Sequence, residues 1–131
     1  MVVRTSYGDE TAWSTFQEQA LAPSDEGFEA YVEFHSDPTL DGLSVDDVTA
    51  QLDPSYEMSF VCVADERAVS EDEHPVVVVN LREKPGSARG RSFRVTTAEL
   101  WSVENNLSEA NMDFDEFADP ADAADGVFRG F

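Results

Sequence analysis

Two short segments of this chain, residues 58–64 and 76–81, are apolar on both faces and rich in β-branched or aromatic side chains. Such residues favour extended backbone. Because successive side chains of a strand point to opposite faces, these segments need cover on both sides. The pattern therefore predicts two central strands of a sheet that is packed by other elements.

Three further segments are typical of strands. Residues 2–5 and 92–95 are short, and residues 84–90 before the latter contain Pro and Gly, which predicts a long hairpin loop. Residues 28–34 alternate strictly between apolar and polar side chains. We therefore expect one face of the sheet to meet water at that strand.

Capping patterns mark four helix starts. Asp9 precedes apolar residues at helical spacing, and Pro23 lies beyond them. The other starts are expected near residues 44, 96 and 113, where a Ser, Thr or Asp is followed three residues later by an acid. Together these elements predict one domain over residues 1–131, of the α/β or α+β class. Its two or three layers would hold a mixed sheet of four or five strands packed by three or four helices.

The charge balance excludes some partners. The chain of 131 residues has 28 Asp and Glu against 8 Lys and Arg, a net charge of −20. Nucleic acid and anionic membranes are not expected partners, because they would meet a repulsive field. As a charged sphere in water, the fold has a gross self-repulsion of roughly 14 kcal/mol at 0.15 M salt and about half of that at 1 M. The acids are scattered, which favours adaptation to a salty solvent over a functional acidic face.

The expected location is the cytoplasm. No apolar run approaches the ~18 residues of a membrane span, and the first residues lack the pattern of a signal peptide. Cys62 is the only cysteine, so no internal disulfide is expected. We expect a monomer or a weak homodimer with an unknown protein partner.

Cysteine and histidine chemistry is not favoured. Cys62 lies inside an apolar strand, where a small filler is the simpler interpretation than a nucleophile. His74 follows Ser70 and the acidic residues 71–73, which together could hold a metal or act as a base, but the simpler interpretation is a solvated loop. A zinc site needs three or four converging ligands. No catalytic residue, metal or cofactor is therefore assigned.

Five of the eight cations lie between residues 82 and 94: Arg82, Lys84, Arg89, Arg91 and Arg94. Glu83 is the only acid among them. Arg82, Arg89, Arg91 and Arg94 could contact an anionic ligand or an acidic partner peptide. The favoured alternative is a hairpin whose cations pair with the surrounding acidic surface.

A polar constellation follows at residues 101–113. Its members are Trp101, Glu104, Asn105, Asn106, Ser108, Asn111 and Asp113. Two carboxylates with several amides could bind a polar ligand, or act as acid and base if burial separates their pKa values. Asn side chains also satisfy backbone groups at helix ends, which is the simpler alternative.

The segments 101–108, 110–118 and 125–131 resemble an uncharacterised bacterial domain family found largely in actinobacteria. The resemblance runs from residue 3 to residue 131. Arg129, in the last of these segments, is a further candidate binding residue. It implies membership of the family and no activity. The chain is more acidic than the family pattern at residues 70–73, which again favours solvent adaptation.

Three functions remain open from the sequence. The leading hypothesis is a non-catalytic protein- or peptide-binding module, of inhibitor or immunity type, which an exposed apolar patch near Phe128 and Phe131 would support. The alternative is a small enzyme that uses Glu104 and Asp113 on a polar substrate. The third is a nucleic-acid mimic.

Overall fold

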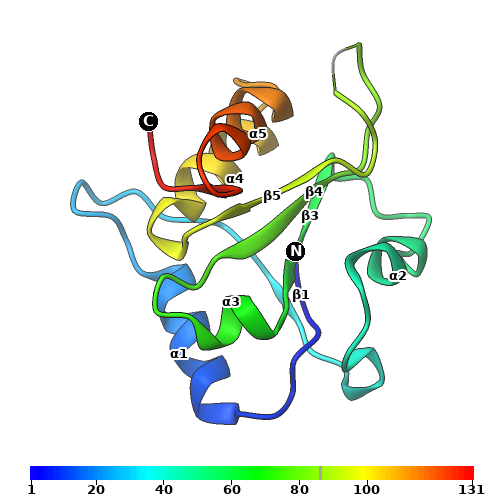
Figure 1. Cartoon of the computed structure of the whole chain (residues 1–131), viewed down its shortest axis with the longest axis vertical. Helices are drawn as coiled ribbons and strands as arrows, with labels where there is room; N and C mark the ends of the chain where they lie inside the picture. Colours follow the sequence, from blue (N-terminus) through cyan, green and yellow to red (C-terminus); the bar gives the residue numbers. More distant parts are fainter. Residues whose placement is uncertain (86) are drawn as a thin grey trace.

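The computed structural model describes residues 1–85 and 87–131. Within them lie a six-stranded sheet, five α-helices and two short 3-10 helices (Figure 1). The strands are β1 (Val2–Arg4), β2 (Phe34–His35), β3 (Phe60–Ala64), β4 (Val76–Asn80), β5 (Ser92–Val95) and β6 (Val127–Phe128). The helices are α1 (Glu10–Leu21), α2 (Val45–Ala50), α3 (Glu66–Ser70), α4 (Leu100–Ser108) and α5 (Phe114–Ala123), with the 3-10 helices η1 (Pro38–Leu40) and η2 (Thr97–Glu99).

The sheet is mixed, with strand order β2-β1-β3-β4-β5-β6. Strand β1 is parallel to β2 and to β3, whereas β3, β4 and β5 are antiparallel neighbours, and β6 is parallel to β5. Cys62 of β3 pairs with Val2 and with Val78, and every residue of β3 and β4 is buried. The prediction of two central strands is confirmed.

The two faces of the sheet are covered unequally. One face packs against α1, α3, α4 and α5 in a large core that contains Phe16, Leu100 and Phe117. The other face presents five buried valines of β1, β3 and β4, and only Val48 of α2 joins them as a fully buried residue. In Figure 1, α2 stands on the side of the sheet away from α4 and α5. This face is therefore covered only in part, by one six-residue helix and by loops.

The predicted numbers of four or five strands and three or four helices are wrong by at least one each. Strand β6 has two residues and helix α3 has five, too short to show a period. Residues 29–33 do alternate in burial, with Ala30 buried between exposed Glu29 and Tyr31, whereas Phe28 is exposed. They form no regular strand, and only Phe34–His35 pairs with β1.

Two capping predictions are confirmed in atomic detail. The Asp9 carboxylate accepts from the amide of Ala12, and Ser44 forms a reciprocal capping box with Asp47. The start near residue 96 opens instead as η2, and neither Thr96 nor Asp113 caps its helix with a side chain. The predicted hairpin joins β4 to β5, although Gly86 of its 84–90 loop lies outside the described residues.

Candidate functional site

The polar residues predicted on α4 hold the segment between α1 and β2. Glu104 is 5% exposed, and its carboxylate accepts the amide of Tyr31 and the Ser108 hydroxyl, the latter at 2.9 Å. Asn105 Nδ2 donates to the Glu29 carbonyl at 3.0 Å. Glu104 thus supplies the hydrogen-bond acceptor that a neighbouring strand would otherwise give to the Tyr31 amide.

The other predicted residues of this region also bond locally. Trp101 stacks on Phe28 with ring centroids 4.8 Å apart, and Asn105 Nδ2 also donates to the Trp101 carbonyl at 2.7 Å. Asn106 Nδ2 donates to the Ser102 carbonyl at 2.8 Å, and Asn111 Nδ2 to the Glu109 carboxylate at 3.2 Å. These bonds satisfy the helix and its neighbours rather than a ligand.

Glu104 and Asp113 do not share a pocket. Asp113 lines a hollow beside β4 with Asn80 and Arg82, and Glu104 is not among the described residues of that lining. The hollow that Asp113 lines therefore does not offer Glu104 as the second carboxylate of an acid–base pair.

Replacing Glu104 by leucine is expected to lower the free energy of unfolding by about 2 kcal/mol, because the Tyr31 amide loses its acceptor. Glutamine keeps an acceptor oxygen, so Glu104→Gln should cost less than about 1 kcal/mol. Urea unfolding of both variants measures the difference. Equal losses would contradict the role given to this oxygen.

Two of the four arginines proposed as anion contacts are already paired. Arg91 donates to Asp115 at 2.6 Å and to Asp119 and Asp122 at 2.8 Å, all on α5. Hydrogen bonds from these carboxylates raise the pKa of the Arg91 guanidinium above its usual range. Arg94 donates to both carboxylate oxygens of Asp65 and to the Pro75 carbonyl. These contacts match the alternative of a hairpin paired with acids.

The remaining hairpin cations make fewer contacts. The Arg82 guanidinium donates to the Glu57 carbonyl, and its amide to Asn80 Oδ1 at 3.2 Å. Arg82, Lys84 and Arg89 form no ion pair with a carboxylate within residues 1–85 and 87–131.

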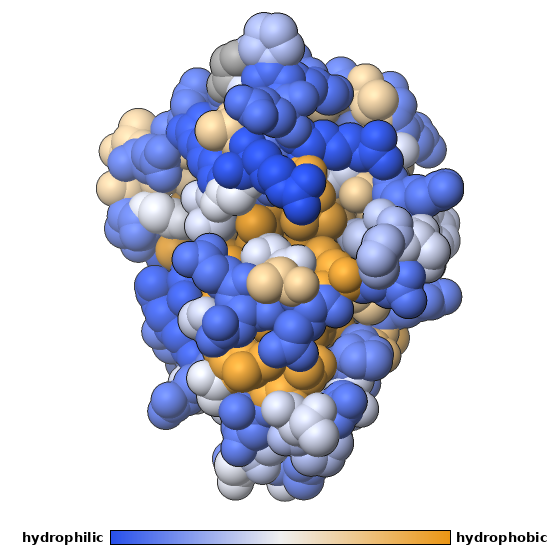
Figure 2. All heavy atoms as spheres, turned by 90° about the vertical axis from the view of Figure 1, so that its right-hand side faces the viewer, coloured by the Kyte–Doolittle hydropathy of each residue, from blue (hydrophilic) through white to orange (hydrophobic). Residues whose placement is uncertain are grey.

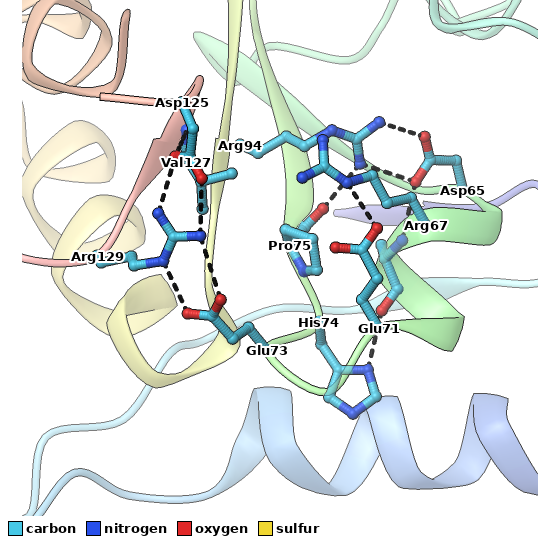
Figure 3. Close-up of polar contacts among 11 residues, drawn as sticks. Asp65, Arg67, Glu71, Glu73, His74, Pro75, Arg94, Asp125, Val127 and Arg129 are labelled. Atoms are coloured by element: carbon cyan, nitrogen blue, oxygen red, sulfur yellow. Dashed lines mark hydrogen bonds and ion pairs between the residues drawn. The ribbon is translucent and has the colours of Figure 1, made fainter. Parts of the chain in front are cut away.

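Arg129 clamps the C-terminal segment onto the loop before β4. It donates to the carboxylates of Glu73 and Asp125 at 2.8 to 3.1 Å (Figure 3). The hydrogen bond from Arg129 lowers the pKa of Asp125 to about 2, although desolvation opposes the shift. Its guanidinium is thus engaged within the chain.

His74 and Cys62 are both structural. The prediction of a solvated loop is wrong at His74, which is 7% exposed, with Nδ1 2.9 Å from the Ala68 carbonyl (Figure 3). Burial raises the pKa of the Cys62 thiol to about 12, so the nucleophilic thiolate is suppressed at neutral pH. The described part of the chain holds no group of three or more His, Cys, Asp or Glu residues placed for a metal ion.

A partly apolar pocket lies over the less covered sheet face and was not predicted. It is a pocket of about 590 Å³, which we call the α2 pocket. Its apolar lining comprises Met1, Val3, Leu40, Val48, Leu52 and Tyr56, and its polar lining includes His35, Asp37, Asp53 and Glu57. Figure 2 looks onto this side of the molecule and shows hydrophobic surface between hydrophilic edges.

Comparison with protein families identifies the chain as a whole. One family model, described as a domain of unknown function (DUF6924), matches residues 1–131. The chain belongs to this family. Comparison with curated proteins gives no match. The expected membership of an uncharacterised family is confirmed, and no activity comes with it.

Three pieces of this DUF6924 domain build the α2 pocket. The β1 strand supplies Val3, the turn after β2 supplies Leu40, and residues 48–57 supply the far wall. The Tyr56 hydroxyl donates to the Phe60 carbonyl at 2.9 Å, and burial raises its pKa to about 12. The wall is therefore tied to β3.

Among the described residues of the DUF6924 domain, every helix is too short or too polar to span a membrane.

The volume of the α2 pocket falls within the roughly 300 to 1,000 Å³ of known ligand sites. Its lining combines six apolar and seven polar residues, and concave, partly apolar sites of this size are where ligands commonly bind.

Proposed function

We propose that this domain is a non-catalytic module that binds a segment of another protein in the α2 pocket. The supporting observation is the sheet face that α2 leaves incompletely covered. The half-buried apolar residues there are Met1, Leu40, Leu43, Val45, Leu52, Tyr56 and Leu81. An apolar side chain that fills the pocket would gain about 1.5 to 3 kcal/mol from burial.

Two alternatives to binding in the α2 pocket have less support. Phe131 is 82% exposed, but Phe128 beside it is buried, so the C-terminal patch is one ring wide. An enzyme built on Glu104 and Asp113 lacks a shared pocket. We further propose that the module acts in the cytoplasm, where Cys62 stays reduced. An inhibitor or immunity-type role is one form that this binding could take.

The proposal is tested by selecting binders from a displayed library of random 12-residue peptides. Leu52→Glu places a charge in the pocket wall and should lower the affinity for the selected peptides at least tenfold. Leu21→Glu is the matched control, because Leu21 is 46% exposed at the end of α1. Its effect should stay within about twofold, since surface substitutions away from the site change little.

A second variant keeps the test decisive if Leu52→Glu unfolds the protein. Gln51 is exposed and lines the pocket, so Gln51→Trp fills it from the rim without removing a core contact. It should block the same peptides. A library that gives no binders, or binders that tolerate both pocket variants, would contradict the proposal.

A further inference from the structure

Among the described residues, the formally charged side chains that line the α2 pocket are all acidic. Residues 5–66 contain fifteen Asp and Glu and no Lys or Arg. Asp37, Asp53 and Glu57 contribute to the lining of the pocket itself. A docked segment therefore meets only negative side chains around its apolar anchor at this end, apart from His35.

A second hollow of about 440 Å³ lies beside the α2 pocket. The two hollows adjoin, because both are lined by Leu52, Asp53 and Tyr56. Arg82 and Arg89 line its other side. Figure 2 shows strongly hydrophilic surface beside the hydrophobic centre of this face.

These arginines differ from most cations of the chain. Arg4, Arg67, Arg91, Arg94 and Arg129 form ion pairs with eight carboxylates. Among residues 1–85 and 87–131, Arg82, Lys84 and Arg89 are the cations without such a pair.

Asp53, the acid nearest to hand in this hollow, forms no ion pair with Arg82 or Arg89. Asp53 lines the same hollow, and its carboxylate accepts instead from the amide and hydroxyl of Ser55. In a chain with a net charge of −20, this edge offers cationic side chains to an outside carboxylate.

We propose that the bound segment carries opposite charges at its two ends. Its apolar anchor lies in the α2 pocket, with Lys or Arg beside Asp37, which lines the α2 pocket but not the second hollow, and Asp or Glu beside Arg82 and Arg89. This inference rests on the proposed function and specifies its ligand. The arrangement selects both partner and orientation, because a reversed segment places like charges together. A uniformly acidic or basic segment would be repelled at one end.

The test uses the same displayed 12-residue library on the whole chain and on the variant Arg82→Glu with Arg89→Glu. Binders of the natural chain should carry basic residues on one side of an apolar anchor and acidic residues on the other. Binders of the variant should carry basic residues on both sides. This switch in selected charge is a readout that a loss of stability does not produce.

Affinity measurements on one selected peptide complete the test. Arg89→Glu should weaken it about tenfold, whereas a peptide with its acids changed to Asn should bind both proteins within about twofold. Arg67→Glu is the control, because it changes the net charge equally on the exposed surface of α3. The affinity should fall as KCl rises, since salt screens exposed pairs.

The outcomes separate the two proposals. Binders that lose affinity with Leu52→Glu but show no acidic end would overturn this inference and leave the α2 pocket as the binding site. Binders that ignore Leu52→Glu would overturn both. If a second copy of the chain covers this face, sedimentation will show a dimer that Leu52→Glu dissociates, and the bipolar segment is then wrong.

Discussion

Replacing Arg94 by methionine is expected to lower the free energy of unfolding by about 3 kcal/mol, near the lower end for breaking a buried ion pair. Arg94 lies on β5, and its guanidinium donates to the two carboxylate oxygens of Asp65 at 2.9 and 2.6 Å. It also donates to the Pro75 carbonyl at 2.8 Å (Figure 3). The side chains of Arg94 and Asp65 are 21% and 30% exposed, so methionine would leave a largely buried carboxylate unpaired.

The loss should depend on pH. Burial opposes ionisation of Asp65, but hydrogen bonds from Arg94 and the Ala68 amide outweigh it and lower the pKa. A carboxyl with a lowered folded pKa contributes stability above its unfolded pKa of about 3.9, and the contribution disappears as pH falls through the folded value. The difference in the free energy of unfolding between the natural chain and Arg94→Met should therefore be largest at pH 7 and disappear in strong acid.

Chemical unfolding at several pH values measures this gap. Arg67→Met is the matched control, because the Arg67–Glu71 pair on α3 is exposed and such pairs are worth about 0.3 to 0.5 kcal/mol. Equal losses for the two variants would refute the anchoring role of Arg94.

The melting temperature is expected to rise by about 8 °C between 0.1 M and 2 M KCl. Screening should relieve about 2 kcal/mol of net repulsion in the folded chain, and each kcal/mol moves the transition by roughly 4 °C at this size. Eight carboxylates lie in ion pairs with arginines, which leaves most of the 28 acids without a cation.

A charge variant separates screening from other effects of salt. Glu18, Glu26, Glu33 and Glu83 are exposed and form no ion pair among the described residues. Changing all four to Gln moves the net charge from −20 to −16. The variant should melt higher at 0.1 M KCl and respond less to added salt. A flat or falling curve for the natural chain would rule out the screening argument.

The central strands were predictable because their burial leaves a local signal. Strand β4 has valines on both faces, and a central strand of a covered sheet is the position that buries both faces. The segment before β2 was harder, since the Tyr31 amide is satisfied by Glu104, 73 residues away. The short helix α3 has one local signal in the sequence. Asp65 lies three residues before Ala68, and its carboxylate accepts the Ala68 amide as an N-cap.

The candidate site was less predictable than the fold. The sequence indicated a possible ligand site at Glu104 and its amide neighbours, with local hydrogen bonding as the simpler alternative, and the structure gives these groups local partners. The α2 pocket joins Val3, Leu40 and Leu52, which are ordinary apolar residues far apart in the chain. Only the topology brings them together, because β1 must pair with β3 before that sheet face exists.

The central claim is that the α2 face, and not α4, carries the function. The most direct measurement is the change in backbone amide chemical shifts when a selected peptide is titrated into the labelled protein. We expect the largest changes at Val3, Val48, Leu52 and Tyr56, extending to Arg89. Changes concentrated on α4 and residues 22–33, with the α2 pocket unaffected, would contradict the account.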